Sequence, residues 1–292
     1  MQIRVPATSA NLGPGFDALG LALALYDVVA LRITDSGLFV DVAGEGAERV
    51  RRDKRNLVVR AVRATFEHLG GQPRGLEIVC ANRIPHSRGL GSSAAAIVAG
   101  VCAARAVVLG GLPDEQALAI ATSLEGHPDN VAACLYGGAT AAWVEEAGTR
   151  AVRLAVHPSV HPVAFIPASG RQSTRGARAL LPAQVPHEDA VRTAGRAALL
   201  VHALAAAPEL LLPATLDALH QPYRLETQPR GAALLAKLRD AGVAATLSGS
   251  GPSLLVLATG PEQAAMAQGL APRGWTARPL AVDTGGAIVL PG

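Results

Sequence analysis

The sequence predicts an α+β protein with a division near residue 150. Its 292 residues are enough for two domains or one large one. Half of the residues are apolar and 17% are charged, which excludes an intrinsically disordered chain. A polar, turn-like stretch at 145–150 separates an expected N-terminal domain, 1–150, from a C-terminal domain, 151–292, in which strands and helices alternate.

Apolar runs predict the strands of the first half. They lie at 2–5, 21–34, 38–44, 75–81 and 137–144. The run at 21–34 is long, and Tyr26–Asp27 within it predicts a bend or a break.

Three helices are predicted between these strands. Residues 56–70 place apolar side chains at helical spacing, and Gly70–Gly71 ends that helix. Two more helices are predicted at 92–110 and at 113–124, the second with Pro113 near its first turn.

The second half begins with two predicted strands and ends with a strand–turn–strand–helix–strand series. A mostly helical stretch at 188–241 separates them. The predicted strands lie at 151–156, 161–167, 244–248, 253–259 and near 275–283, with a helix at 261–270.

Composition argues against nucleic-acid and membrane partners. The net charge is +3, and the only dense basic run, 48–55, has no interleaved aromatic residues, so it reads as a solvated loop. The apolar run at 94–104 is too short to span a bilayer. The N-terminal residues lack the apolar segment of a secretion signal, and three cysteines without metal-ligand spacing predict buried thiols. We therefore expect a cytoplasmic protein.

Three Gly-rich clusters occupy 6–20, 89–95 and 248–254. A tight turn alone would explain any one of them, but the second cluster has further features. Gly89 and Gly91 would let backbone N–H groups approach a polyphosphate, and the helix that starts at the following serines would present its positive end to the anion. Neither a GxxxxGK[ST] nor a GxGxxG pattern is present, so Arg88 and a metal ion would have to assist.

A second polar cluster follows a predicted helix in "EGHPDN". Glu125, His127, Asp129 and Asn130 lie within six residues. Helix capping accounts for one such side chain and leaves a histidine and two carboxylates unexplained, which favours a functional role.

Together the segments "PATSANLGPGFDALGLAL", "PHSRGLGSSAAA" and "LSGSGPSLLVL" resemble the three motifs of the GHMP kinase superfamily. The resemblance implies the GHMP kinase fold, with a ribosomal protein S5 domain 2-like N-terminal domain and a ferredoxin-like C-terminal domain. Within the superfamily, "EGHPDNVA" and "STRGAR" are similar to the members that phosphorylate the side-chain hydroxyl of L-homoserine with ATP, a step toward threonine.

The resemblance also implies the site residues. Adenine would lie near Asn56, and the acids and the arginines would bind the ammonium and the carboxylate of a zwitterion, respectively. The phosphate loop would be formed by Pro85, His86, Ser87, Arg88, Gly89, Leu90, Gly91, Ser92, Ser93, Ala94 and Ala95. The amino-acid pocket would be formed by Asn11, Asp17, His127, Asp129, Arg175 and Arg224.

Catalysis is expected to depend on alignment and charge neutralisation. Relatives such as mevalonate kinase use an aspartate as general base at the position of Asn130, which cannot accept a proton in that way. The hydroxyl would lose its proton to the phosphate, with Arg175, Asn130 and Ser93 as the catalytic residues. Mg²⁺ would be held by Ser93 and Glu125, because Ala119 stands where some members carry a metal-binding glutamate.

Three alternatives remain open on the sequence. A mevalonate-type GHMP kinase is one, although the acids around the pocket suit an ammonium that mevalonate lacks. A GHMP-fold protein that binds ligand without catalysis is the second, and the intact "GLGSSA" argues against it. A structural α+β protein is the third. Relatives are often dimers, so a homodimer is a further expectation.

Overall fold

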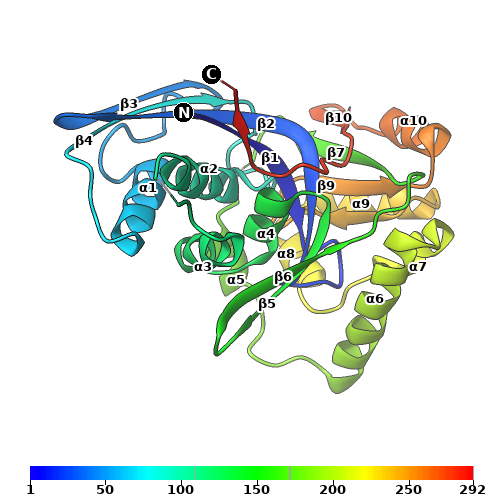
Figure 1. The fold of residues 1–292 in the computed structure, drawn as a ribbon. Coiled ribbons are helices and arrows are strands. Elements are labelled where there is room, and N and C mark those ends of the chain that lie inside the picture. The colour runs from blue at the N-terminus through cyan, green and yellow to red at the C-terminus, as the bar shows by residue number, and fades with distance from the viewer. Residues whose placement is uncertain (109, 171, 292) are drawn as a thin grey trace.

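The computed structural model describes residues 1–108, 110–170 and 172–291. They form an α+β fold with a seven-stranded sheet and a four-stranded sheet, each carrying its own helices (Figure 1). The predicted fold class is confirmed.

The seven-stranded sheet is built mostly from the first half of the chain. Its central path is β11-β1-β2-β4-β3, and β5 pairs with the start of β2 and with β6. All pairs are antiparallel except β3 with β4. The strands are β1 (Gln2–Ala10), β2 (Leu19–Thr34), β3 (Gly37–Gly44), β4 (Gly75–Asn82), β5 (Ala139–Glu145), β6 (Gly148–Leu154) and β11 (Ile288–Leu290).

Four helices cover one face of this sheet (Figure 1). They are α1 (Leu57–His68), α2 (Ser92–Ala106), α3 (Asp114–Glu125) and α4 (Asp129–Tyr136). Helix α2 is buried over most of its length because its side chains are nearly all small or apolar. Gly100 lets α1 approach it closely, since a Cβ there would lie 2.7 Å from the Cβ of Ala61.

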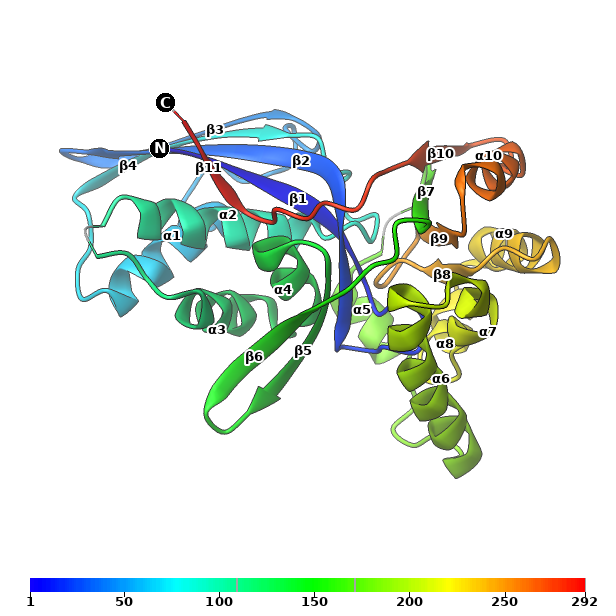
Figure 2. The same ribbon diagram turned by 45° about the vertical axis from the view of Figure 1, so that its right-hand side comes forward.

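The four-stranded sheet is antiparallel, with the order β10-β7-β9-β8 expected of a ferredoxin-like domain. It lies beside the first sheet (Figure 2). The strands are β7 (His161–Pro167), β8 (Ala245–Leu247), β9 (Leu254–Ala258) and β10 (Trp275–Pro279). The helical elements are α5 (Thr174–Ala179), α6 (His187–Ala205), η1 (Pro208–Leu210), α7 (Leu211–Ala214), α8 (Gln221–Glu226), α9 (Pro229–Asp240) and α10 (Pro261–Gly269).

Several predicted boundaries move in the structure. Strand β2 runs unbroken through Tyr26–Asp27, and the predicted bend is a register shift in which Pro6 pairs with Tyr26 but Ala7 pairs with Leu23. Helix α2 ends at Ala106, before the predicted residue 110, and residue 109 lies outside the described residues.

The turn predicted at 145–150 is shorter in the structure, where β5 ends at Glu145 and β6 begins at Gly148. Strands β5 and β6 form a hairpin that begins its return at Gly148, so residue 150 lies inside β6. Strand β11 returns to pair with β1. The two sheets therefore do not separate at one point of the chain, and the two-domain division at 150 stays a prediction. Among the described residues, no helix is both long and apolar enough to cross a membrane.

Candidate active site

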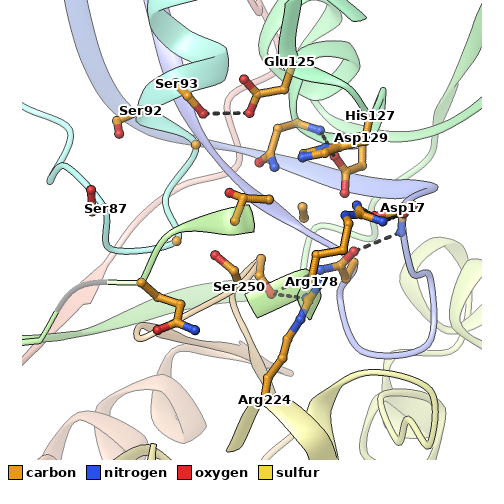
Figure 3. A pocket seen from close by; sticks show the side chains of 18 residues that line it. Asp17, Ser87, Ser92, Ser93, Glu125, His127, Asp129, Arg178, Arg224 and Ser250 are labelled. Atoms are coloured by element: carbon orange, nitrogen blue, oxygen red, sulfur yellow. Dashed lines mark hydrogen bonds and ion pairs between the residues drawn. The ribbon is translucent and has the colours of Figure 1, made fainter. Parts of the chain in front are cut away.

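Two neighbouring cavities share Ser92 and Ser93, the first residues of α2. The first cavity is polar and takes its lining from six segments of the chain (Figure 3). The second is more apolar and lies between α1, α2, the middle of β2 and the end of β4. The polar cavity is lined by Ala10, Asn11, Asp17, Ser87, Gly89, Gly91, Ser92, Ser93, Glu125, His127, Asp129, Asn130, Gln172, Thr174, Arg178, Arg224, Gly249 and Ser250.

The loop before α2 owes its shape to residues with positive φ. Ser87, Gly89 and Gly91 have φ of 56°, 76° and 71°. A Cβ on Gly89 would lie 2.2 Å from the carbonyl oxygen of Ser248, and one on Gly91 would lie 1.9 Å from Oγ1 of Thr8. The two glycines are therefore required because the loop packs against β1 and the β8–β9 turn.

The residues of the predicted phosphate loop divide into four groups. Ser87, Gly89, Gly91, Ser92 and Ser93 line the polar cavity, as expected. His86 and Ala95 line the apolar cavity with Asn56, whereas Pro85 and Arg88 line a shallower hollow beside it. Leu90 and Ala94 are buried in the core, so the structure gives these two a packing role.

Asn56 is buried in the wall of the apolar cavity and caps α1. Its Oδ1 accepts the amide N–H of Val58 at 2.9 Å, and its Nδ2 donates to the carbonyl of Arg51 at 2.7 Å. Asp27, deeper in the same cavity, accepts the amides of Arg83 and Ile84 at 2.6 and 2.9 Å. Burial raises the pKa of Asp27, and its hydrogen bonds fix the chain that enters the phosphate loop.

Ser93 and Glu125 lie together at the start of α2. The hydroxyl of Ser93 donates to Oε1 of Glu125 at 2.6 Å, and burial raises the pKa of Glu125. A hydroxyl and a carboxylate are oxygen ligands of the kind that Mg²⁺ prefers, and Mg²⁺ usually takes only one or two protein ligands besides phosphate and water. The two predicted metal ligands thus fit the ion chemically.

His127 and Asp129 form a close pair above the polar cavity (Figure 3). The His127 Nδ1 lies 2.6 Å from Oδ1 of Asp129. Burial favours neutral imidazole, but the hydrogen bond and charge of Asp129, with the charges of Glu125 and Asp17, outweigh it and raise the pKa of His127.

Asn130 is held by a residue that sequence reasoning missed. Thr8, buried on β1, donates its hydroxyl to Oδ1 of Asn130 at 2.7 Å. The acceptor atom of the amide is engaged, which leaves the Nδ2 donor for the cavity. Thr8 lies within the first of the three clusters, at 6–20, but no feature of that cluster distinguishes this residue from its neighbours.

The loop that carries Asp17 is shaped by left-handed backbone. Asn11, Leu12, Gly13 and Asp17 all have positive φ. Asn11 Oδ1 accepts the amide of Asp17 at 3.0 Å, and Asn11 Nδ2 donates to the carbonyl of Gly249 at 3.2 Å. The predicted pair Asn11 and Asp17 is thus brought together at one wall of the cavity.

The arginine expected at position 175 is replaced by Arg178. Arg175 is exposed and is not among the residues that line the polar cavity. Arg178 lines it instead and holds both carboxylate oxygens of Asp17 at 2.8 Å. Helix α5 turns the side chain of Arg178 inward, three positions further along the same "STRGAR" segment. The "STRGAR" segment thus contributes an arginine to the cavity lining, and that arginine is Arg178.

Arg224 is in the predicted place. It is buried on α8 and lines the polar cavity, and its Nη1 donates to the carbonyl of Gly249 at 3.0 Å. Burial lowers the pKa of Arg224. Gly249 and Ser250 belong to the third Gly-rich cluster, which was recognised in the sequence without assigning it site residues.

Both sheets carry a recognised family signature. The GHMP kinases N-terminal domain matches residues 56–138, and the GHMP kinases C-terminal domain matches residues 196–272. The chain belongs to the GHMP kinase family.

Relatives that match over nearly their whole length, and solved structures, show which members of the GHMP kinase family this chain is similar to. The homoserine kinase of Streptomyces avermitilis is 57% identical over 294 residues, covering 100% of this chain and 96% of that protein. That of Clavibacter michiganensis is 50% identical, covering 99% and 93%. A homoserine kinase structure from Cytophaga hutchinsonii is 30% identical with a TM-score of 0.90, covering 99% and 97%. Within the family, the chain groups with the homoserine kinases.

Proposed function

We propose that the protein transfers the γ-phosphate of ATP to the side-chain hydroxyl of L-homoserine, giving O-phospho-L-homoserine for threonine biosynthesis. The observation that carries the proposal is the junction of an apolar cavity with a polar, charge-lined cavity at the N-terminus of α2. The first suits a nucleoside and the second a small zwitterion. A phosphoryl group at their junction faces the positive end of the helix.

The Asp17–Arg178 pair supports an amino-acid substrate. Its carboxylate and its guanidinium are the two groups that bind an ammonium and a carboxylate, and they hold each other across the cavity (Figure 3). A zwitterion can replace this contact with two equivalent ones, its ammonium on Asp17 and its carboxylate on Arg178 and Arg224. Asn11, His127 and Asp129 complete the wall around it.

Catalysis in this arrangement is by positioning. The substrate oxygen attacks the γ-phosphorus, the bond from that phosphorus to the bridging oxygen breaks, and ADP leaves. Asn130 offers its Nδ2 as a donor to the attacking group and does not act as a base, so the hydroxyl proton passes to a phosphate oxygen. Ser93 and Glu125 would hold Mg²⁺, which supplies charge neutralisation when bound.

A coupled ADP-release assay with Mg-ATP tests the proposal. We expect release that depends on L-homoserine, with no release above background for mevalonate or without acceptor. Phosphorus NMR should show the product as a phosphate monoester. Turnover with mevalonate alone would favour a mevalonate-type kinase, and ATP binding without turnover of either acceptor would favour a non-catalytic binding protein.

A further inference from the structure

A buried histidine outside the predicted site joins two parts of the polar cavity. His220 precedes α8 and is fully buried. Its Nε2 lies 2.8 Å from the carbonyl oxygen of Gly13, and its Nδ1 lies 3.2 Å from Nη1 of Arg224. A carbonyl only accepts and a guanidinium only donates, so Nε2 carries the proton and Nδ1 is the acceptor. The two contacts select one tautomer of a neutral ring.

The surroundings of His220 keep the ring neutral and fixed. It stacks on Phe16 of the Asp17 loop, with centroids 4.9 Å apart and planes 23° apart. The charged groups that face it are Asp217, Arg224 and Asp17. Burial lowers the pKa of His220, the charge of Arg224 lowers it further, and the two aspartates oppose this shift. Asp217 lies 3.5 Å from Nε2, and its two oxygens already accept the amides of Leu219, His220 and Gln221.

The same contacts decide which side of Arg224 is available. His220 and Gly249 together engage Nη1. The Nε of Arg224 is buried and has no hydrogen-bond partner among the described residues. A carboxylate binds a guanidinium through two parallel N–H donors. The side of Arg224 that carries Nε is therefore the side left for a ligand.

We propose that His220 is a positioning residue that holds the Gly13 loop and the Arg224 guanidinium in one fixed relation, so that the Nε side of Arg224 receives the substrate carboxylate. This inference rests on the proposed function, because it assumes a substrate with a carboxylate. It predicts that His220 acts on carboxylate recognition and not on ATP binding or on folding alone.

Two amide variants separate the contacts of the ring. His220→Gln can keep a donor near the position of Nε2 but loses the acceptor for Arg224, whereas His220→Asn can keep an acceptor near Nδ1 but loses the donor to Gly13. We expect kcat/KM for L-homoserine to fall by about ten-fold or more in His220→Gln, since a hydrogen bond to a charged group is lost. The fall should be smaller in His220→Asn. The KM for Mg-ATP should stay within about two-fold in both.

A substrate without a carboxylate tests whether the effect passes through Arg224. The compound 3-aminopropan-1-ol is L-homoserine without that group, so His220→Gln should leave its kcat/KM unchanged. In an Arg224→Gln background, His220→Gln should cause no further loss with L-homoserine, and this comparison is decisive even where the amino alcohol is turned over too slowly to measure. Losses that add in the double variant, or an equal loss with both substrates, would overturn the inference.

The controls distinguish this failure from failure of the proposed function. If the unsubstituted protein releases no ADP in response to L-homoserine, the proposed function itself is contradicted. Normal release together with unchanged kinetics in all His220 variants would remove only the positioning role. Thermal unfolding of each variant is measured alongside, because a purely structural role would lower the melting temperature without the selective change in homoserine kinetics.

Discussion

The apolar and polar cavities meet at Ser92 and Ser93 but are built in different ways. The walls of the apolar cavity come from residues close together along the first half of the chain, and its key polar side chains, Asn56 and Asp27, are occupied by backbone hydrogen bonds. The polar cavity is assembled from both halves, and its lining includes two pairs of side chains, His127–Asp129 and Asp17–Arg178, that hold each other. Under the proposed function, nucleotide recognition would depend on backbone shape and amino-acid recognition on charge placement.

The largest effect is expected where backbone shape is broken. Gly91→Ala places a Cβ 1.9 Å from Thr8 Oγ1 in a left-handed conformation, which should destabilise the protein by about 3 kcal/mol and abolish ATP binding. Gly70→Ala is the matched control, because Gly70 has a similar φ of 82° but nothing within 4 Å, so it should cost only about 1 kcal/mol. Urea unfolding measures the stability of the two variants, and titration calorimetry measures their binding of ATP. Equal losses in the two variants would contradict the packing explanation.

The next effect tests charge placement in the polar cavity. Asp17→Asn removes the carboxylate that holds Arg178, and we expect kcat/KM for L-homoserine to fall by about 100-fold with KM for ATP unchanged. Steady-state kinetics with each substrate varied measures the split. A parallel rise in both KM values would mean that Asp17 affects the binding of ATP as well as that of L-homoserine. Glu145→Gln is the control, since this exposed carboxylate pairs with Arg150, which lines neither cavity, and its loss should change neither KM.

A smaller effect is expected at the adenine side. Asn56→Ala removes the cap of α1 and should cost about 1 kcal/mol of stability. The KM for ATP should rise several-fold while that for L-homoserine stays constant. Asn82→Ala is the comparison, because Asn82 lines the same cavity but caps no helix. If both variants lose the same stability, capping is not the role of Asn56.

The smallest predicted effect concerns two histidines, the partly buried His127 and the fully buried His220. The pKa of His127 is raised by Asp129 and that of His220 is lowered by burial, so their NMR titrations should fall on opposite sides of about 6.5. The contribution of His127 to stability is full below that pH and is lost as pH rises through its folded pKa. The contribution of His220 is full above it and is lost as pH falls. Asp129→Asn should lower the midpoint of His127 alone, and an unchanged midpoint would contradict the assignment.

The sequence predicted most of the fold because its periodic apolar runs coincide with the strands and helices. It did not predict α5 or β11. Strand β11 has three residues and forms because it pairs with β1, a contact that no local pattern encodes. The exposed residues of α5 have no apolar stripe.

The parts of the candidate site that the sequence indicated most clearly are those formed by one continuous segment of the chain. The phosphate loop and "EGHPDN" are contiguous, so composition alone marks them. Arg178 was missed in favour of Arg175 because the contact that distinguishes it is with Asp17, 161 positions earlier in the chain. Thr8 and His220 act through hydrogen bonds that span 122 and 207 positions, which spacing in a sequence cannot reveal.

One contact of the phosphate loop has a consequence for the newly made chain. The hydroxyl of Ser248 donates to the carbonyl of Gly89 at 2.6 Å across 159 positions, and the turn that carries it backs the loop directly. A nascent polypeptide that has not yet emerged as far as Ser248 has its loop residues but not their support. The phosphate loop therefore lacks part of its packing until the segment around Ser248 has been made and has folded against it.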